Sequence, residues 1–378
     1  MHNKQKVAVL QVLPALVSGG VERGTSDIAK ALVENGFRSL VVSAGGPMVK
    51  LIENCGATHI TLPLNSKNPW TIFTNISKLI KIIEEEKIDI IHARSRAPAW
   101  SAYFAAKRTG CKFVTTFHGS YGMSNKFKRT YNAVMAKGQK VIAVSEFIKN
   151  YIANYYPVMK DNVIVIHRGV DTEIFNPKNV HFERMSNLIK QLALPDDKTI
   201  ITLPARISRW KGHLVLIEAL STLNKKQFHC LIAGNLGNNY NYHNEILELM
   251  GKFNLDNNVT FTKSIKDMPA LYMLSDIVVA PSTRPEAFGR IPIEAQAMAK
   301  IIVATNIGGF RESVIDQKNG FLIPANDSKA LAATIKKAMR LTVKQKKIIG
   351  QRARRFVTKN FSLGQMTKKT LDVYKKLL

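Results

Sequence analysis

The chain has 378 residues, 46% of them hydrophobic, so it is too long for one ordinary core and fits two domains of about 150 to 200 residues each. Its three widely spaced cysteines argue against a disulfide framework and a zinc site, and no apolar run approaches the roughly 18 residues that span a bilayer. The formal net charge of +28 opposes folding through self-repulsion, so we expect polyanions nearby.

The first half of the chain alternates strands with helices. Strands are predicted at residues 7–12, 39–43, 89–92, 112–117, 140–144 and 163–166, and a helix at 21–34. Alternation at this spacing is typical of α/β proteins with a parallel, doubly wound sheet. We therefore predict a Rossmann-like domain over residues 1–170.

The second half repeats this pattern after an interruption. Residues 167–198 lose the alternation and contain Pro177 and Pro195, so we place the interdomain connection at 171–198. Strands at 199–204, 228–233, 258–261, 276–280 and 301–304 predict a second Rossmann-like domain over 199–363, followed by a closing helix at 364–378. Because ligands of open α/β sheets bind at the carboxyl ends of the strands, we expect the two domains to face each other across a cleft.

Two carboxylates eight residues apart, Glu286 and Glu294, enclose Phe288, Gly289 and Arg290 directly after the apolar run 276–281. A strand, a turn and a helix in this order bring free backbone N–H groups and the positive end of a helix dipole to one place, which suits a phosphate or a polarised hydroxyl. Either glutamate could then accept hydrogen bonds from sugar hydroxyls. The segment predicts a site for a sugar nucleotide.

Arg206 and Lys211 follow the strand at 199–204. Removing a sugar from a nucleotide leaves a diphosphate whose charge grows in the transition state, and one positioned cation or donor there is typically worth about 10²–10³ in rate. The chain contains no Asp-x-Asp triplet, whose two carboxylates could hold a metal ion beside the diphosphate. We therefore expect these two cations to replace a metal, and no metal or other cofactor.

Two motifs of the first half are also candidates. Ser18-Gly19-Gly20 opens the first helix, where backbone N–H groups can approach a phosphate or the acceptor. The glycine spacing does not fit a dinucleotide fingerprint, and the second strand ends in Ser43 rather than a carboxylate, so we do not expect NAD. His118 ends the strand at 112–117; His92 has a similar position and a weaker signal.

Together these motifs resemble the retaining glycosyltransferases of family 4, which have two Rossmann-like domains in the GT-B arrangement. Glu286 and Glu294 resemble the family's Glu-x7-Glu motif, and Arg206 and Lys211 resemble its phosphate-binding pair. Ser18-Gly19-Gly20 resembles its first glycine loop, and His118 its acceptor-side histidine. The matching motifs lie in both halves of the chain.

The resemblance implies a role for each group. Glu286 would hydrogen-bond the donor sugar, although a nucleophile in a double displacement is the alternative, and Glu294 would hold the ribose. Gly20 and the backbone of residues 288–290 would contact the donor, and the backbone near Ile265 its base. His118 would position the sugar or stabilise charge. Retention would proceed on the front face, and the departing phosphate oxygen would take the acceptor's proton.

Three departures from the family pattern leave the sugar open. Arg168, Ala205 and Ala299-Lys300 stand where Asn, Gly and Gly-Pro are common. None of them removes a proposed catalytic group. By the same resemblance, the closing helix at 364–378 can cross back to the first domain.

The positive charge is concentrated in two acid-free runs. Residues 328–371 carry 13 Lys or Arg, and residues 121–140 carry five, among them Lys126, Lys128, Arg129 and Lys137. Anionic phospholipid attracts such residues by about 1 kcal/mol each. Nucleic acid would use the same charges, but aromatic side chains are not interleaved with them as stacking platforms. Solvated helix faces are the alternative explanation.

We therefore hypothesise a retaining, metal-independent glycosyltransferase of hexosyltransferase type. It would move a sugar from a nucleoside diphosphate sugar to a glycolipid or lipopolysaccharide-type acceptor at the cytoplasmic face of the cell membrane. A cytoplasmic location also agrees with the polar amino terminus, which lacks the apolar region of a signal peptide. The alternatives are a sugar-nucleotide epimerase or phosphorylase of the same architecture and, more remotely, a nucleic-acid-binding protein.

Overall fold

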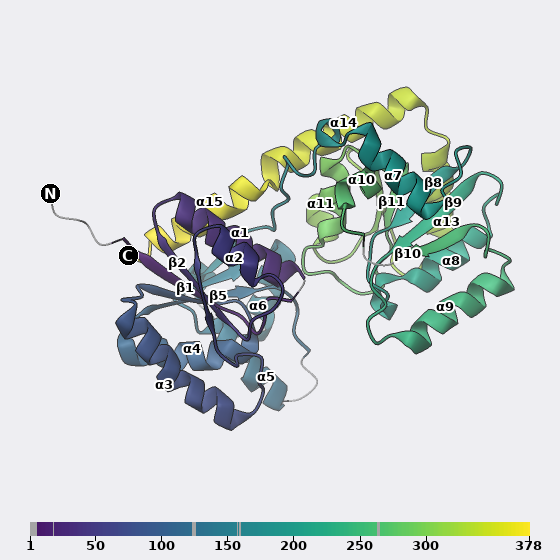
Figure 1. Cartoon of the computed structure of the whole chain (residues 1–378). Helices are drawn as coiled ribbons and strands as arrows, with labels where there is room; N and C mark the ends of the chain where they lie inside the picture. The colour runs from purple at the N-terminus through teal and green to yellow at the C-terminus, as the bar shows by residue number, and fades with distance from the viewer. Residues whose placement is uncertain (1–5, 18, 123–125, 157, 159, 263–264) are drawn as a thin grey trace. The chain divides into compact units, whose positions relative to one another are not determined.

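The structure is a computed structural model that describes every residue except 1–5, 18, 123–125, 157, 159 and 263–264 (Figure 1). Ser18 of the predicted glycine loop thus lies outside the described residues. The chain divides into two compact units: unit 1 is Met1–Gly169 with Leu363–Leu378, and unit 2 is Val170–Ser362. Each unit is built on one parallel sheet, so the predicted α/β class with two Rossmann-like domains is confirmed.

A seven-stranded parallel sheet forms the centre of unit 1, in the order β3-β2-β1-β4-β5-β6-β7. Its inner strands are almost continuously apolar and buried, as expected of a parallel sheet covered on both faces. The order reverses between β1 and β4, which makes their carboxyl ends the topological switch point of this sheet. The strands are β1 (Ala8–Val12), β2 (Arg38–Ser43), β3 (Thr58–Thr61), β4 (Ile90–Ala93), β5 (Lys112–Phe117), β6 (Lys140–Ala143) and β7 (Val163–Val165).

The last helix of the chain packs on unit 1. Met366 and Tyr374 belong to the same buried cluster as Val9 and Ile28, so this helix lies beside α1 (Figure 1). The helices and 3₁₀ turns of the unit are α1 (Gly20–Glu34), α2 (Val49–Asn54), α3 (Pro69–Glu85), α4 (Arg96–Thr109), α5 (Lys126–Ala133), η1 (Val134–Ala136), α6 (Glu146–Tyr155), η2 (Lys160–Asn162) and α15 (Leu363–Lys375).

Unit 2 has a six-stranded parallel sheet in the order β10-β9-β8-β11-β12-β13, so its switch point lies between β8 and β11. The strands are β8 (Thr199–Leu203), β9 (Phe228–Ala233), β10 (Val259–Thr262), β11 (Ile277–Ala280), β12 (Ile301–Thr305) and β13 (Phe321–Ile323). The helices and 3₁₀ turns are η3 (Pro177–Asn179), α7 (Phe182–Leu192), η4 (Arg209–Lys211), α8 (His213–Ser221), α9 (Tyr240–Lys252), α10 (Met268–Leu274), α11 (Arg290–Ala297), α12 (Phe310–Ser313), α13 (Ser328–Met339) and α14 (Val343–Asn360).

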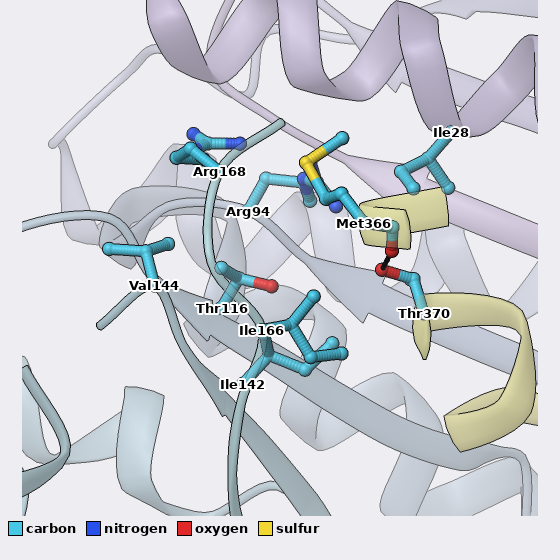
Figure 2. A pocket seen from close by; sticks show the side chains of 9 residues that line it. All are labelled: Ile28, Arg94, Thr116, Ile142, Val144, Ile166, Arg168, Met366 and Thr370. Atoms are coloured by element: carbon cyan, nitrogen blue, oxygen red, sulfur yellow. Dashed lines mark hydrogen bonds between the residues drawn. The ribbon is translucent and has the colours of Figure 1, made fainter. Parts of the chain in front are cut away.

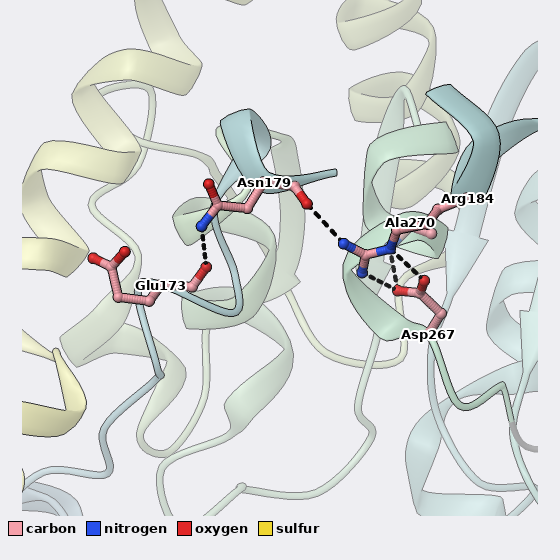
Figure 3. Close-up of polar contacts among 5 residues, drawn as sticks. All are labelled: Glu173, Asn179, Arg184, Asp267 and Ala270. Atoms are coloured by element: carbon pink, nitrogen blue, oxygen red, sulfur yellow. Dashed lines mark hydrogen bonds and ion pairs between the residues drawn. The ribbon is translucent and has the colours of Figure 1, made fainter. Parts of the chain in front are cut away.

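The segment 171–198, predicted as a connection, belongs to unit 2 and contains α7. Arg184 of α7 donates two hydrogen bonds of 2.7 Å to the carboxylate of Asp267, which also accepts from the backbone N–H of Ala270 and so caps α10 (Figure 3). A third bond runs from Arg184 to the carbonyl of Asn179. The prolines interrupt the strand alternation, but this ion pair attaches the segment to the domain.

Two edge strands were not predicted. β3 has the sequence Thr-His-Ile-Thr, which is only partly buried because it lies at the edge of its sheet. β13 has three residues, too few for a hydrophobic pattern to be distinguished from a loop. Both misses lie far from the candidate site motifs in the sequence.

Candidate functional site

Lys211 and Glu286 form a close ion pair at the switch point of unit 2. Lys211 ends η4 after β8, and Glu286 lies in the loop after the neighbouring strand β11. The Lys211 Nζ atom is 2.5 Å from Glu286 Oε1, and the two side chains are only 14% and 10% exposed. Carboxyl ends of adjacent parallel strands meet at one edge of a sheet, which explains how residues 75 positions apart come together.

The loop that carries Glu286 is held by several hydrogen bonds. Ser282 Oγ donates to Glu286 Oε1 at 3.0 Å, and Thr305 Oγ1 donates to the carbonyl of Ser282 at 2.9 Å. The backbone N–H of Gly309 donates to the carbonyl of Glu286 at 2.9 Å. Both side-chain contacts of Glu286 fall on Oε1, so Oε2 is the atom that can accept a bond from a ligand hydroxyl.

A glycine allows the Lys211 loop to approach the strand beside it. Gly212 has φ +77°, and a Cβ atom there would lie 1.9 Å from the carbonyl oxygen of Pro281. Any other residue would therefore push the two loops apart and separate Lys211 from Glu286. The indole of Trp210 adds a cation-π contact, with Lys211 Nζ 4.1 Å and Arg206 Cζ 5.8 Å from the ring centroid.

Glu294 lies on α11 and already has two partners. The Tyr272 hydroxyl donates to Oε2 at 3.0 Å, and Arg290 Nε lies 3.1 Å from Oε1 as an ion pair without hydrogen-bond geometry. Burial, followed by the charge of Glu294, raises the pKa of Tyr272 well above its usual value, which keeps this hydroxyl a donor. A ribose would have to share the carboxylate with Tyr272 or displace it.

The segment between the two glutamates offers backbone rather than side chains. Phe288 is buried, with its ring edge-on to Phe361 at 5.3 Å. Gly289 precedes α11 with φ +84°, and a Cβ atom there would lie 2.1 Å from the ring of Phe310. Ile265 is a half-buried loop residue between β10 and α10. These positions agree with contacts made by main-chain groups at a helix start.

His118 lies in unit 1, directly after β5. Its Nδ1 is 2.8 Å from an Arg168 nitrogen, and because arginine can only donate, Nδ1 accepts and the neutral ring carries its proton on Nε2. Burial lowers the pKa of His118 well below its usual value, and the charges of Arg168 and Arg94 lower it further. Within the described part of the chain, Nε2 is buried without a hydrogen-bond partner. The ring can therefore donate one bond to a ligand oxygen, but it is not an acid at neutral pH.

Gly20 and His92 also lie in unit 1. Gly20 begins α1, and its carbonyl accepts a bond of 3.1 Å from Arg168, whereas the other predicted donor-binding residues lie in unit 2. His92 is fully buried, with one ring nitrogen 2.6 Å from the Tyr374 hydroxyl and the other 2.7 Å from Thr116 Oγ1. Because both nitrogens are occupied, His92 is a structural residue.

The structure thus joins predicted site residues in two ion pairs that the sequence did not predict, and it adds partners that the motifs do not reveal. Lys211 meets Glu286, and Arg290 meets Glu294. The contacts of Ser282 with Glu286 and of Tyr272 with Glu294 could not be predicted from the sequence, because the first depends on the conformation of a loop and the second on how separate helices pack. Among the described residues, no cluster of three or more His, Cys, Asp or Glu could hold a metal ion, and no helix is long and apolar enough to cross a membrane.

Both units match family models of glycosyltransferases. Residues 18–174 match the family model "Glycosyltransferase Family 4", and residues 185–356 match the model "Glycosyl transferases group 1". The crystal structure of a glycosyltransferase from Rickettsia africae ESF-5 is 43% identical, with a TM-score of 0.92 and 99% of each chain covered.

Two more distant proteins are also similar. A lipopolysaccharide 1,2-N-acetylglucosaminetransferase of Salmonella typhimurium is 26% identical over 370 residues, 93% of this chain and 92% of its own. The structure of Anabaena HepE in complex with UDP-glucose has a TM-score of 0.86 over 98% of this chain and 99% of its own. At 22% identity, the second likeness concerns the fold alone.

Proposed function

Since the chain belongs to the group 1 and family 4 glycosyltransferases and has their GT-B fold, we propose that it is a retaining, metal-independent enzyme that uses a nucleoside diphosphate sugar. The acceptor in this proposal is a glycolipid or lipopolysaccharide precursor. The use of a nucleoside diphosphate sugar as donor is supported by the buried Lys211–Glu286 pair at the switch point of unit 2. A cation for a diphosphate and a carboxylate for a sugar hydroxyl lie there side by side.

In the proposed reaction, the bond between the anomeric carbon and the donor phosphate oxygen breaks, and a bond to an acceptor oxygen forms on the same face. The departing phosphate oxygen takes the acceptor's proton, so no protein base is required. Lys211 and Arg206 stabilise the charge that grows on the diphosphate. Glu286 accepts a bond from a sugar hydroxyl through Oε2, and the neutral His118 donates from Nε2.

The metal-independent part rests on the chemistry of the two cations. Lys211 Nζ and Arg206 Cζ lie 4.1 Å and 5.8 Å from the ring centroid of Trp210, so both positive charges lie in the loop that follows β8. Transfer that continues in EDTA would support this part, and transfer that stops until Mg²⁺ or Mn²⁺ is restored would contradict it. Product of inverted configuration would contradict the retaining part.

The membrane part rests on a face of unit 1 formed by α3, α4 and α5. Trp70 and Phe73 of α3 stack at 6.1 Å while 73% and 62% exposed, and Phe127 of α5 is 87% exposed. Trp100 of α4 stacks on the exposed Phe104 and donates from its indole to the carbonyl of residue 131 at 3.0 Å. Exposed aromatic rings next to lysines and arginines suit the interface of an anionic membrane.

The basic residues named from the sequence lie on or near this face. Lys128 and Arg129 are exposed on α5 and Lys137 is exposed just after η1, whereas the side chain of Lys126 lies outside the described residues. Flotation of the protein with vesicles that contain phosphatidylglycerol, but not with neutral vesicles, is the expected result. Absence of flotation in both cases would remove the proposed peripheral location at the cytoplasmic face of the membrane.

The activity itself is tested by incubating the protein with nucleoside diphosphate sugars and extracted membrane lipid. A released nucleoside diphosphate together with a glycosylated lipid supports the proposal. Phosphorolysis or epimerisation of the sugar nucleotide without any acceptor would favour the phosphorylase or epimerase instead.

A further inference from the structure

The switch point of unit 1 carries a buried arginine that none of the roles above uses. Arg94 follows β4 directly, and its backbone N–H donates to the carbonyl of Val12, the last residue of β1. Arg94 therefore occupies the same kind of position in unit 1 as Glu286 in unit 2, after the strand that begins the reversed half of the sheet. In open α/β sheets this edge is where ligands bind.

Among the residues that the structure describes, Arg94 has no counter-ion in direct contact. The residue is 3% exposed, and its buried Nε atom has no hydrogen-bond partner in the described part of the chain. Within the part of the chain that the structure describes, no carboxylate forms an ion pair with its guanidinium. Burial lowers the pKa of Arg94, although Tyr374 and Asp27 oppose this. A buried charge without a partner is strongly unfavourable, so the site is complementary to an anion.

A small cavity of about 20 Å³ lies beside this guanidinium, lined also by Arg168 and Thr116 (Figure 2). A Cβ atom on Gly24 of α1 would lie 2.4 Å from one Arg168 nitrogen and 3.3 Å from an Arg94 nitrogen. The two guanidinium groups therefore converge on one spot that only a glycine leaves open. The volume admits about one oxygen-sized atom, while Arg168 also contacts His118.

We propose that Arg94 and Arg168 bind an oxyanion, a phosphate or a carboxylate, that is carried by the acceptor. This inference rests on the proposed function, in which unit 1 receives the acceptor. One oxygen of the anion enters the cavity and takes charged hydrogen bonds from the guanidinium groups, and the rest of the acceptor remains outside. The enzyme thereby prefers an anionic acceptor over its neutral analogue.

The test is calorimetric titration of the full chain with inorganic phosphate at constant ionic strength, with UDP at saturation to occupy the donor site. We expect Arg94→Met to weaken phosphate binding at least about tenfold, the scale of one charged hydrogen bond. Arg168→Asn places the residue common in the family at this position and is expected to weaken binding as well. Arg108→Met, at an exposed arginine of α4, is the control and leaves binding unchanged.

Unchanged phosphate affinity in Arg94→Met would overturn the inference, and so would equal binding of chloride in place of phosphate. If Arg94→Met does not fold, the phosphate affinity of Arg168→Asn is the deciding measurement, and an unchanged affinity would again overturn the inference. Lys211→Met separates this inference from the proposed donor site, because it is expected to abolish UDP binding and leave the Arg94-dependent phosphate binding intact. Loss of phosphate binding in Lys211→Met alone would overturn the inference and leave the donor site standing.

Discussion

The switch points of the two sheets differ in whether their charged side chains form ion pairs. In unit 2 the charges come in pairs, Lys211 with Glu286 and Arg290 with Glu294. In unit 1, Arg94 is buried without a carboxylate in ion-pair contact among the described residues, next to Arg168 and a neutral His118. The same topology therefore carries a site with two ion pairs in unit 2, the paired site, and a site of positive charge around Arg94 in unit 1, the positive site.

This difference indicates how each site accepts a ligand. In the function proposed for unit 2, a diphosphate takes Lys211 from Glu286, and the carboxylate then accepts a bond from a sugar hydroxyl. Exchange of one anion for another limits the desolvation cost of binding. In the site inferred for unit 1, no carboxylate of the described residues pairs with Arg94, so an anion would supply its first counter-charge.

Replacing the cation of the paired site should have the largest effect. Lys211→Met is expected to lower the rate of sugar transfer about 10²–10³-fold, because the growing charge on the diphosphate loses its nearest cation. The measurement is kcat/KM for the nucleotide sugar, which needs no saturation of the variant. Arg209→Met is the matched control, since Arg209 lies two residues earlier, is exposed and pairs with Glu245. Equal loss in both variants would contradict a specific role for Lys211.

Replacing the anion of the same pair should cost less. Glu286→Gln keeps the shape and removes the charge, so we expect transfer to fall by at least about tenfold while the fold survives. Steady-state kinetics and circular dichroism are the measurements, with Glu245→Gln as the control. Turnover equal to that of the unmodified protein would remove Glu286 from the site.

The neutral state of His118, in the positive site, should make the free energy of unfolding depend on pH. The folded state keeps His118 neutral well below pH 6.5, whereas the unfolded chain takes up a proton there. The free energy of unfolding should therefore fall as the pH drops from 7 to 5, by at most about 1.4 kcal/mol per pH unit for one histidine. His118→Gln should make this slope smaller in urea titrations. A slope that stays the same would contradict a neutral His118.

The smallest effect is expected from removing exposed aromatic rings of α3 in unit 1, which should weaken binding to anionic vesicles. Trp70→Ala with Phe73→Ala should reduce binding to anionic vesicles several-fold without changing the melting temperature, because both rings are already exposed in water. Phe182→Ala in unit 2 removes an aromatic ring of 81% exposure and should leave vesicle binding unchanged. Equal loss in both proteins would mean that general hydrophobicity, rather than this face, binds the membrane.

The sequence allowed the paired site to be predicted better than the positive one. Lys211 and Glu286 stand in motifs that follow strong apolar strands, and parallel strand ends bring such residues to one edge. Arg94 also follows a strand, but its importance depends on burial without a partner, which no local pattern reveals. Arg168 was noticed only as a departure from the family pattern. Tyr272 reaches Glu294 across 22 residues, a contact that only the packing of α10 on its neighbours decides.

The bounds of a strand could be predicted from the sequence where the strand is buried on both faces. β1, β5 and β9 begin and end within one residue of their predicted bounds. β3 was missed because an edge strand needs fewer apolar residues. The segment 171–198 was assigned to a connection because the Arg184–Asp267 pair that fixes it joins residues 83 positions apart.

The central claim is that unit 2 binds a nucleoside diphosphate without a metal through Lys211. The most direct test is a thermal-shift titration of the full chain with UDP, GDP, ADP and CMP in the presence of EDTA, alongside Lys211→Met. We expect that one nucleoside diphosphate stabilises the protein in EDTA and that Lys211→Met loses this stabilisation. A folded protein that responds to none of them, or only after Mg²⁺ is added, would contradict it.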